Sequence, residues 1–248
     1  MEESPTVPPI HKSLARGAAR MALREGHRQM EERLKQLPNF ENVTGEHSAV
    51  RQSKIIVSMF GDRLVMARTE FAGKRSEVMA VGLDTRVTEG RPELALFVVR
   101  AEKDSTRIVW LDYQVSQHAL ERFQQRRFGV VQRIESLVDE FFPSVLTAMQ
   151  GITQVERPRE EQLLPTATGA LISAYSDDKD MRVGVTWIAL EQLRPEQLLE
   201  RDRRLSEAQS YLAQLFTIRR SGKIAGRGDR VTSWVRGPLL KQETAPLA

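Results

Sequence analysis

The sequence predicts an α+β protein in which a mostly antiparallel sheet is flanked by helices, with an N-terminal helix and a basic C-terminal extension. Between 53 and 115, short segments with alternating apolar residues are separated by glycine-containing turns, which is typical of successive hairpins. At Ser116 the apolar period changes to that of a helix. A further hairpin and a long amphipathic segment follow before 216, so both kinds of element belong to one main domain.

Composition excludes several classes of protein. The chain has 248 residues, of which 40% are hydrophobic, so it can form one substantial core. No apolar run reaches the roughly 18 residues of a membrane helix, and the first ten residues lack the apolar region of a signal peptide. Cysteine is absent, which excludes disulfides, thiolate metal ligands and cysteine nucleophiles. These features predict a cytoplasmic protein.

The N-terminal part is expected to contain a disordered leader over 1–10, a helix over 11–37 and a linker over 39–52. Cations recur along this helix at every fourth position, which predicts one basic stripe: Lys12, Arg16, Arg20, Arg24 and Arg28. An apolar stripe is predicted beside it: Leu14, Ala18, Met21, Met30, Leu34 and Leu37.

The main domain is predicted over 53–216, with a β-rich half (53–115) and a helix–hairpin–helix half (116–216). The expected strands of the first half are 53–60, 63–71, 75–83, 93–101 and 106–115. The expected elements of the second half are a helix over 116–127 with Ser116 as its N-cap, a helix over 130–142 that can continue after a kink over 143–150, a hairpin of 169–175 with 181–190, and a helix over 195–216. The basic extension, 217–248, is expected to hold one strand at 231–236.

Positive charge is concentrated near the two ends of the chain. Residues 11–37 hold seven Lys or Arg against three acids, residues 217–241 hold seven against one, and residues 38–216 hold 23 against 26. This asymmetry favours contact with a polyanion, and a flexible cationic tail with an aromatic residue can follow a phosphate backbone and stack a base. The predicted nucleic-acid-binding residues are Arg16, Arg20, Arg24, Arg219, Arg220, Lys223, Arg227, Arg230 and Trp234.

Several motifs of known chemistry are absent from the sequence. It contains no Walker A sequence, no G-x-G-x-x-G after a strand and no G-x-S-x-G elbow. The four histidines are scattered without the spacing of metal ligands, so no metal or other cofactor is expected. The acids between 177 and 180 are most simply the polar residues of a hairpin turn.

One local pattern points to chemistry. The segment 116–126 has the form S-x-H-A-x-x-R-x-x-x-R, which places His118, Arg122 and Arg126 along one side of a helix. Cleavage of RNA through its 2′-hydroxyl needs a proton acceptor that works near neutral pH and cations for the charge that develops on phosphorus. Histidine suits the first task and arginine the second, so these three residues are the candidate catalytic site.

This pattern resembles the signature helix of toxin-related domains allied to the barnase–colicin–RelE class of ribonucleases, over about residues 113–190. The resemblance implies a compact domain with such a helix before an antiparallel sheet, for which 169–190 would supply strands. It also implies metal-independent ribonuclease activity, with His118 as the motif histidine and Arg122 and Arg126 as its arginines.

The expected function is therefore a nucleic-acid-associated protein, RNA being preferred to DNA, with a ribonuclease-like site as its most specific form. Two alternatives remain open. His118 and the arginines can form an ordinary solvated helix face. The whole chain can instead be a non-catalytic interaction or assembly protein that docks a protein partner through its N-terminal helix and basic tail. The sequence leaves the oligomeric state undetermined.

Overall fold

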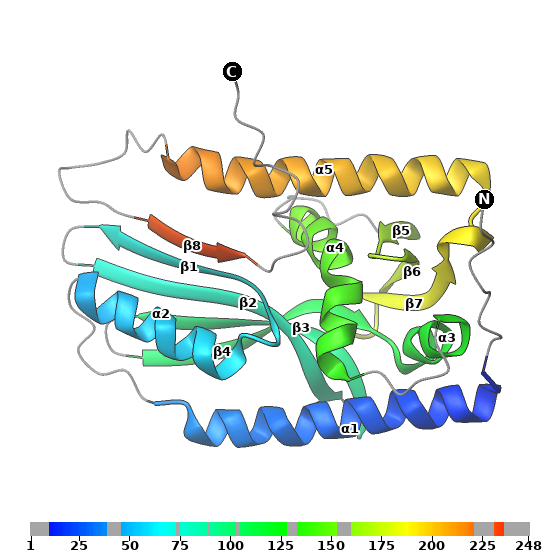
Figure 1. The fold of residues 1–248 in the computed structure, drawn as a ribbon, viewed down its shortest axis with the longest axis horizontal. Coiled ribbons are helices and arrows are strands. Elements are labelled where there is room, and N and C mark those ends of the chain that lie inside the picture. The colour runs from blue at the N-terminus through cyan, green and yellow to red at the C-terminus, as the bar shows by residue number, and fades with distance from the viewer. Residues whose placement is uncertain are drawn as a thin grey trace, which may run out of the picture.

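A computed structural model of the chain describes residues 10–38, 46–72, 75–88, 90–102, 105–127, 133–152, 160–220 and 231–235. These residues form an α+β fold with eight strands in one sheet and helices around it (Figure 1). Most of the predicted leader and most of the basic extension lie outside the described residues.

The sheet is mostly antiparallel, as the sequence predicts. Its strands, in chain order, are β1 (Leu64–Ala72), β2 (Arg75–Thr88), β3 (Arg91–Glu102), β4 (Ser105–Val115), β5 (Gln162–Pro165), β6 (Gly169–Ser176), β7 (Met181–Ala189) and β8 (Val231–Val235). The spatial order is β5-β6-β7-β4-β3-β2-β1-β8. The two halves of the sheet meet at a short parallel pairing of Tyr113–Val115 with Arg182–Gly184.

Five α-helices surround this sheet in the described part of the chain. They are α1 (Lys12–Gln36), α2 (Glu46–Phe60), α3 (Gln117–Arg127), α4 (Ile134–Ile152) and α5 (Pro195–Arg220), and a short 3₁₀ helix, η1 (Leu190–Gln192), follows β7. The long helices α1 and α5 lie along opposite sides of the molecule, with α4 between them (Figure 1). Within the described residues, no helix is both long and apolar enough to cross a membrane.

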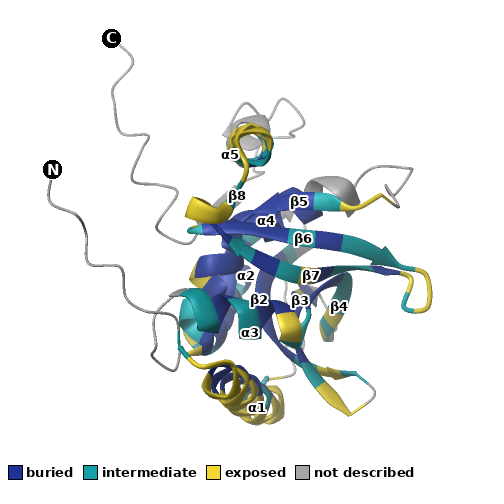
Figure 2. Cartoon of the chain, turned by 90° about the vertical axis from the view of Figure 1, so that its right-hand side faces the viewer, coloured by how far each residue is buried: buried dark blue, intermediate teal, exposed yellow. Residues whose placement is uncertain are grey.

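Two clusters of buried side chains form the core. The larger one joins α4, α3 and the central strands through Phe141, Phe123 and Trp187. The smaller one packs α2 on the sheet through Ile56, Phe60 and Phe97. Figure 2 shows the central strands buried and the outer surfaces of α1 and α5 exposed. The helices on the outside are therefore the elements that present charge to solvent.

The prediction of a strand over 53–60 is wrong, because this segment belongs to the helix α2, and α2 also takes up the second half of the predicted linker 39–52. The buried residues of α2 recur at helical spacing, at Ala49, Gln52, Ile56 and Phe60. The β-branched run at 55–57 suggested a strand, but packing on the sheet outweighs that local preference. The four-residue strand β5 was also not predicted.

The helix over 11–37 is confirmed, but its buried face differs from the predicted apolar stripe. Leu14 and Met21 are 66% and 60% exposed, respectively, and Leu34 is also exposed. The residues that α1 buries are mostly small: Ala15, Ala18, Ala19, Ala22, Leu23, Gly26 and Met30. Small side chains let the helix backbone approach closely, and a Cβ at Gly26 would lie 2.6 Å from Thr85 Oγ1. Close packing on the body of the protein decides the orientation of α1.

The other predicted elements are confirmed in type. These are the strands at 63–71, 75–83, 93–101 and 106–115, the helices at 116–127, 130–150 and 195–216, the hairpin of 169–175 with 181–190, and the strand at 231–236. Pro143 lies inside α4, so the predicted continuation of that helix is also confirmed.

Candidate functional site

Ser116 determines where α3 begins and how it is attached to the sheet. Its hydroxyl accepts a hydrogen bond from the Ala119 amide at 3.2 Å, as an N-cap does, and also lies 3.2 Å from the Val185 carbonyl, to which it donates. Its own amide donates to the Gly184 carbonyl at 2.9 Å. The first turn of α3, which carries His118, is therefore held against β7.

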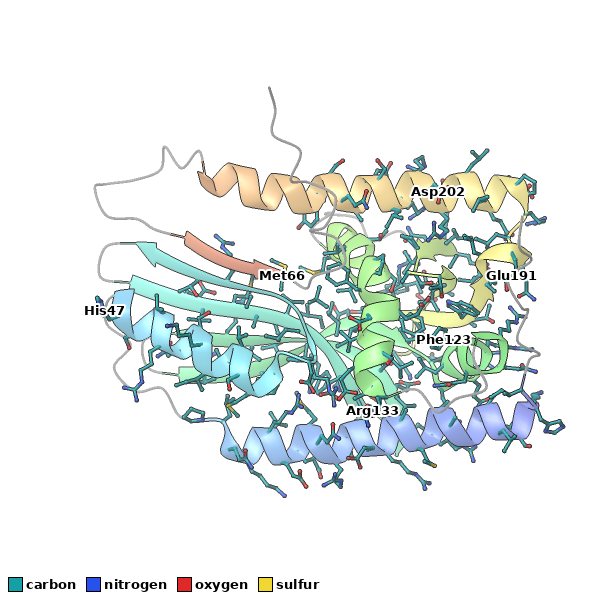
Figure 3. All side chains as sticks on the ribbon, in the orientation of Figure 1. His47, Met66, Phe123, Arg133, Glu191 and Asp202 are labelled. Atoms are coloured by element: carbon teal, nitrogen blue, oxygen red, sulfur yellow. The ribbon has the colours of Figure 1, made fainter. Side chains whose placement is uncertain are left out.

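The apolar side of α3 determines the direction in which the polar side points. Phe123 packs edge-on against Phe141 of α4 and Trp187 of β7, with ring centroids 5.8 and 5.2 Å apart, respectively. Figure 3 shows Phe123 between α3 and α4. Because this side of the helix is buried, the opposite side is presented outward, and His118 is exposed there.

His118 lines a concavity of about 570 Å³ that is built from three separate elements. One wall is α1, the second is Gly90 with the start of β3, and the third is Ser116 with the N-terminal part of α3. The described residues that line it are Arg20, Arg24, Gly90, Arg91, Pro92, Glu93, Ser116, Gln117, His118 and Glu121. Its volume lies within the range of about 300–1,000 Å³ that is usual for small-molecule sites.

Both acids among the described lining residues of this concavity are held by cations. The carboxylate of Glu93 lies 3.2 Å from Lys179 Nζ, and Glu93 itself is buried. Glu121 lies 3.5 Å from the Arg16 guanidinium and accepts a hydrogen bond from Gln117 at 2.7 Å. Their negative charge is therefore compensated before any ligand arrives.

The three arginines among the described lining residues, in contrast to the acids, have no partner in the described part of the chain. Arg20, Arg24 and Arg91 are exposed, and in the part of the chain that the structure describes they have no side-chain hydrogen bond or ion pair. Arginine donates up to five hydrogen bonds and stays charged at all physiological pH values. The concavity thus combines unoccupied cationic donors with compensated acids, which is the arrangement an anion requires.

The arginines of the basic stripe on α1 have different partners. Arg28 is bonded by Glu25 and Glu32, each at 2.6 Å, and Arg16 is engaged by Glu121. Of the cations of α1, Arg20 and Arg24 are the two among the described residues that line the concavity. Of the three α1 arginines that the sequence singled out, Arg20 and Arg24 are therefore brought together with His118, and Arg16 lies at the edge of the same region.

The structure places Arg122 and Arg126 apart from His118's concavity, since neither lines it. Arg122 donates to Gln125 Oε1 at 3.3 Å along the same helix. Arg126 donates to the Trp187 carbonyl at 3.1 Å. Burial, and then the neighbouring Arg122 guanidinium, lower the pKa of Arg126. The two arginines are close to each other, and Arg126 fastens α3 to β7.

Two polar centres lie inside the body of the protein. Arg63 is fully buried and forms ion pairs with Asp84, Asp62 and Glu135, so it joins the start of β1 to β2 and α4. A second cavity, of about 310 Å³, shares Glu135 with this network and is lined by Met21, Ala22, Glu25, Gln29, Arg133, Ile134 and Glu135. Figure 3 shows Arg133 at the end of α4 that faces α1. The acids of this cavity are bonded to Arg28 and Arg63, and Arg133 is the one described cation that lines it.

The second polar centre surrounds Glu140 of α4. Its carboxylate accepts hydrogen bonds from Thr166 Oγ1 at 2.7 Å, Thr168 Oγ1 at 2.8 Å and the Thr168 amide at 3.1 Å. The Trp187 indole donates to it at 3.3 Å. Arg201 of α5 donates nearby to the Thr166 carbonyl at 2.9 Å. These bonds connect α4, the β5–β6 turn, β7 and α5, and they are structural.

A tyrosine hydroxyl can also transfer protons, but Tyr113 and Tyr175 are both engaged away from the concavity. Tyr113 is completely buried and shares a 2.7 Å hydrogen bond with Ser144, and burial raises its pKa above the ordinary range. Tyr175 donates to Asp180 at the β6–β7 turn. Among the residues the structure describes, no group of His, Asp and Glu has the arrangement of a metal site.

The predicted tail residues lie largely beyond what is described. Lys223, Arg227 and Arg230 are outside the described residues. Arg219 and Arg220 are the last two residues of α5, where the structure describes their backbone. Trp234 lies on β8, opposite Ala67 of β1. The structure therefore gives β8 a place at the edge of the sheet.

Sequence analysis did not single out Arg91 or Lys179. The one local signal was the Gly90-Arg91-Pro92 turn, where Gly90 has a φ of +74°. Turns often carry binding residues, but only the packing of α1 on α3 and β2 shows that this turn faces two further arginines. No family model, no curated protein and no solved structure matches this chain.

Proposed function

We propose that this protein binds nucleic acid by holding phosphate groups in the concavity between α1, the β2–β3 turn and α3. The observation that carries the proposal is the convergence of Arg20, Arg24 and Arg91 beside His118, where both neighbouring acids are already paired. Guanidinium groups recognise phosphate oxygens with paired, charge-assisted hydrogen bonds. RNA is the preferred partner because of the ribonuclease-like motif around His118.

The lining residues indicate the kind of contact. No Phe, Tyr or Trp is among the described residues that line the concavity, so the large rings that usually stack bases are not part of this lining. Phosphate and sugar contacts carry no sequence information by themselves. The expected binding is therefore strong at low salt, weak in sequence preference and directed at the backbone.

The test is a titration of a fluorescein-labelled single-stranded RNA with the full-length chain, followed by anisotropy at several salt concentrations. Arg20→Gln, Arg24→Gln and Arg91→Gln should each weaken binding and lower the log–log salt slope by about 0.7 for each phosphate that the variant no longer binds. Arg107→Gln is the matched control. Arg107 is an exposed arginine on β4 that pairs with Arg100 of β3. Arg100 is nine residues along β3 from Arg91, so at about 3.3 Å per residue the control lies about 30 Å from the concavity. Equal effects of all four substitutions would remove the concavity from the proposal.

Metal-independent cleavage of RNA is the second candidate, because His118 lies in the same concavity as the arginines. In that reaction His118 takes the proton of a 2′-hydroxyl, whose oxygen attacks the adjacent phosphorus. The bond to the 5′-oxygen breaks, the leaving oxygen takes a proton from water, and a 2′,3′-cyclic phosphate forms. Arg20, Arg24 and Arg91 would carry the role that the motif assigns to Arg122 and Arg126. Cleavage of total RNA in EDTA by wild type, and its loss in His118→Ala, would support this candidate.

A protein-docking role for α1 has one supporting observation, the exposure of Leu14 and Met21 on its outer face. The buried side of α1 is already used by the body of the protein. Docking would therefore have to use the face that carries these two residues. Leu14→Ser with Met21→Ser distinguishes the two functions, because it should leave RNA affinity unchanged if α1 acts through its arginines.

A further inference from the structure

The balance of charge in the concavity indicates which phosphate it accepts best. With Glu93 paired to Lys179 and Glu121 paired to Arg16, three uncompensated guanidiniums remain among the described residues that line the concavity. A phosphodiester inside a strand carries one negative charge, whereas a phosphate monoester carries about 1.5–2 at pH 7. A monoester also has three terminal oxygens, and each can accept hydrogen bonds.

The shape of the site leads to the same conclusion. Its nitrogen-bearing side chains come from three elements, with Arg20 and Arg24 on α1, Arg91 at the start of β3 and His118 on α3. Donors that converge from several sides suit a terminal group with oxygens in several directions, whereas a continuous strand favours donors in a row along its path. The four-residue spacing of Arg20 and Arg24 puts two donors on the same wall.

We infer that the concavity is a phosphate-monoester site, whose ligand is the phosphorylated end of a nucleic-acid strand or a free nucleotide. This inference rests on the proposed function and makes it more specific. A monoester held beside His118 presents no internal phosphodiester to that histidine, so the inference implies binding of strand ends without cleavage.

The experiment compares one short single-stranded RNA with a 5′-phosphate, a 3′-phosphate or hydroxyls at both ends, titrated with the full-length chain. At least one of the two phosphorylated RNAs should bind about tenfold more tightly than the RNA with hydroxyls at both ends. This factor corresponds to one added charge-assisted hydrogen bond. Arg24→Gln and Arg91→Gln should abolish this preference, and Arg107→Gln should preserve it. Competition by a nucleoside monophosphate and by inorganic phosphate shows whether the strand contributes beyond its terminal group.

The outcomes separate the inference from the proposed function. If all three RNAs bind equally and the arginine variants weaken them equally, the monoester site is wrong and backbone binding stands. If the free monophosphate binds in an Arg24-dependent manner but no RNA binds, the site stands and the nucleic-acid function fails. Absence of binding by all of these probes would overturn both. Cleavage of the RNAs that depends on His118 would also overturn the inference.

Discussion

The Arg63 guanidinium and the Asp84 carboxylate form an ion pair that is closed to solvent. Arg63 Nε lies 3.2 Å from Asp84 Oδ2, and neither side chain exposes any surface. Gln29 of α1 accepts a hydrogen bond from the same guanidinium, and Arg33 of α1 bonds Asp62 with two contacts of 2.7 Å. This network joins the helix that carries Arg20 and Arg24 to the sheet, so the candidate site depends on it for its geometry.

Replacement of Arg63 by methionine should destabilise the protein by about 3–5 kcal/mol at pH 7.5, because a buried carboxylate loses its partner. The loss should be smaller at pH 5.5, where Asp84 can take up a proton and become neutral. Urea unfolding at both pH values measures the difference, with Arg107→Met as the exposed control. A loss of equal size at both pH values would show that Asp84 does not depend on Arg63.

The stability of the wild-type protein should itself depend on Asp84. Burial raises the pKa of Asp84 from 3.8 to about 6, while the Arg63 guanidinium opposes that rise. The folded state therefore holds this proton more tightly than the unfolded state, so the resulting stabilisation is complete below about pH 4 and is lost as the pH rises through about 6. Relative to Asp84→Asn, which cannot titrate, the wild-type free energy of unfolding should fall across this window. A constant difference between pH 4 and 7 would contradict the prediction.

Glu140→Ala should cost about 2–4 kcal/mol, because the Thr168 amide and the two threonine hydroxyls lose a charged acceptor in the core. The variant is compared with Glu196→Ala, an exposed acid on α5 whose side chain is 65% exposed. Thermal unfolding followed by circular dichroism gives both values. Equal melting temperatures for the two variants would mean that the Glu140 cluster does not hold α4 to the β5–β6 turn.

Substitution of Arg126 should affect stability, whereas substitution of His118 should affect RNA binding. Arg126→Gln removes a hydrogen bond to the Trp187 carbonyl, so it should cost about 0.5–1.5 kcal/mol and leave RNA affinity nearly unchanged. His118 is exposed, so His118→Ala should leave stability within about 0.5 kcal/mol and act on RNA binding. Unfolding curves and anisotropy titrations of both variants provide the measurement. A large loss of RNA affinity in Arg126→Gln would restore the motif arginine to the site.

The basic tail should bind further phosphates in addition to those held by the concavity. Because β8 pairs with β1, deletion of 217–248 would also remove a strand from the sheet, so charge removal is the cleaner change. Arg219→Gln combined with Arg220→Gln and Lys223→Gln should lower the log–log salt slope for single-stranded RNA by up to about 2. An unchanged slope, with normal binding by the concavity, would exclude these three tail residues from the interface.

The sequence alone was sufficient for elements whose pattern is local. Ser116 before a helical period predicted the start of α3, the alternation on both sides of the 177–180 turn predicted the β6–β7 hairpin, and the i, i+4 cations predicted the exposed stripe of α1. The 53–60 segment was mistaken for a strand because its β-branched run satisfies a local preference that its packing as α2 outweighs.

The tertiary structure decided which charges meet. Four-residue spacing places His118, Arg122 and Arg126 along one helix, but the packing of α3 on β7 directs Arg126 to the Trp187 carbonyl. Arg20 and Arg24 reach His118 only because α1, with its small buried residues, packs closely on α3 and β2. Spacing within one helix is set by its 3.6-residue turn, whereas contacts between segments about 100 residues apart are set by burial of apolar surface in the whole chain.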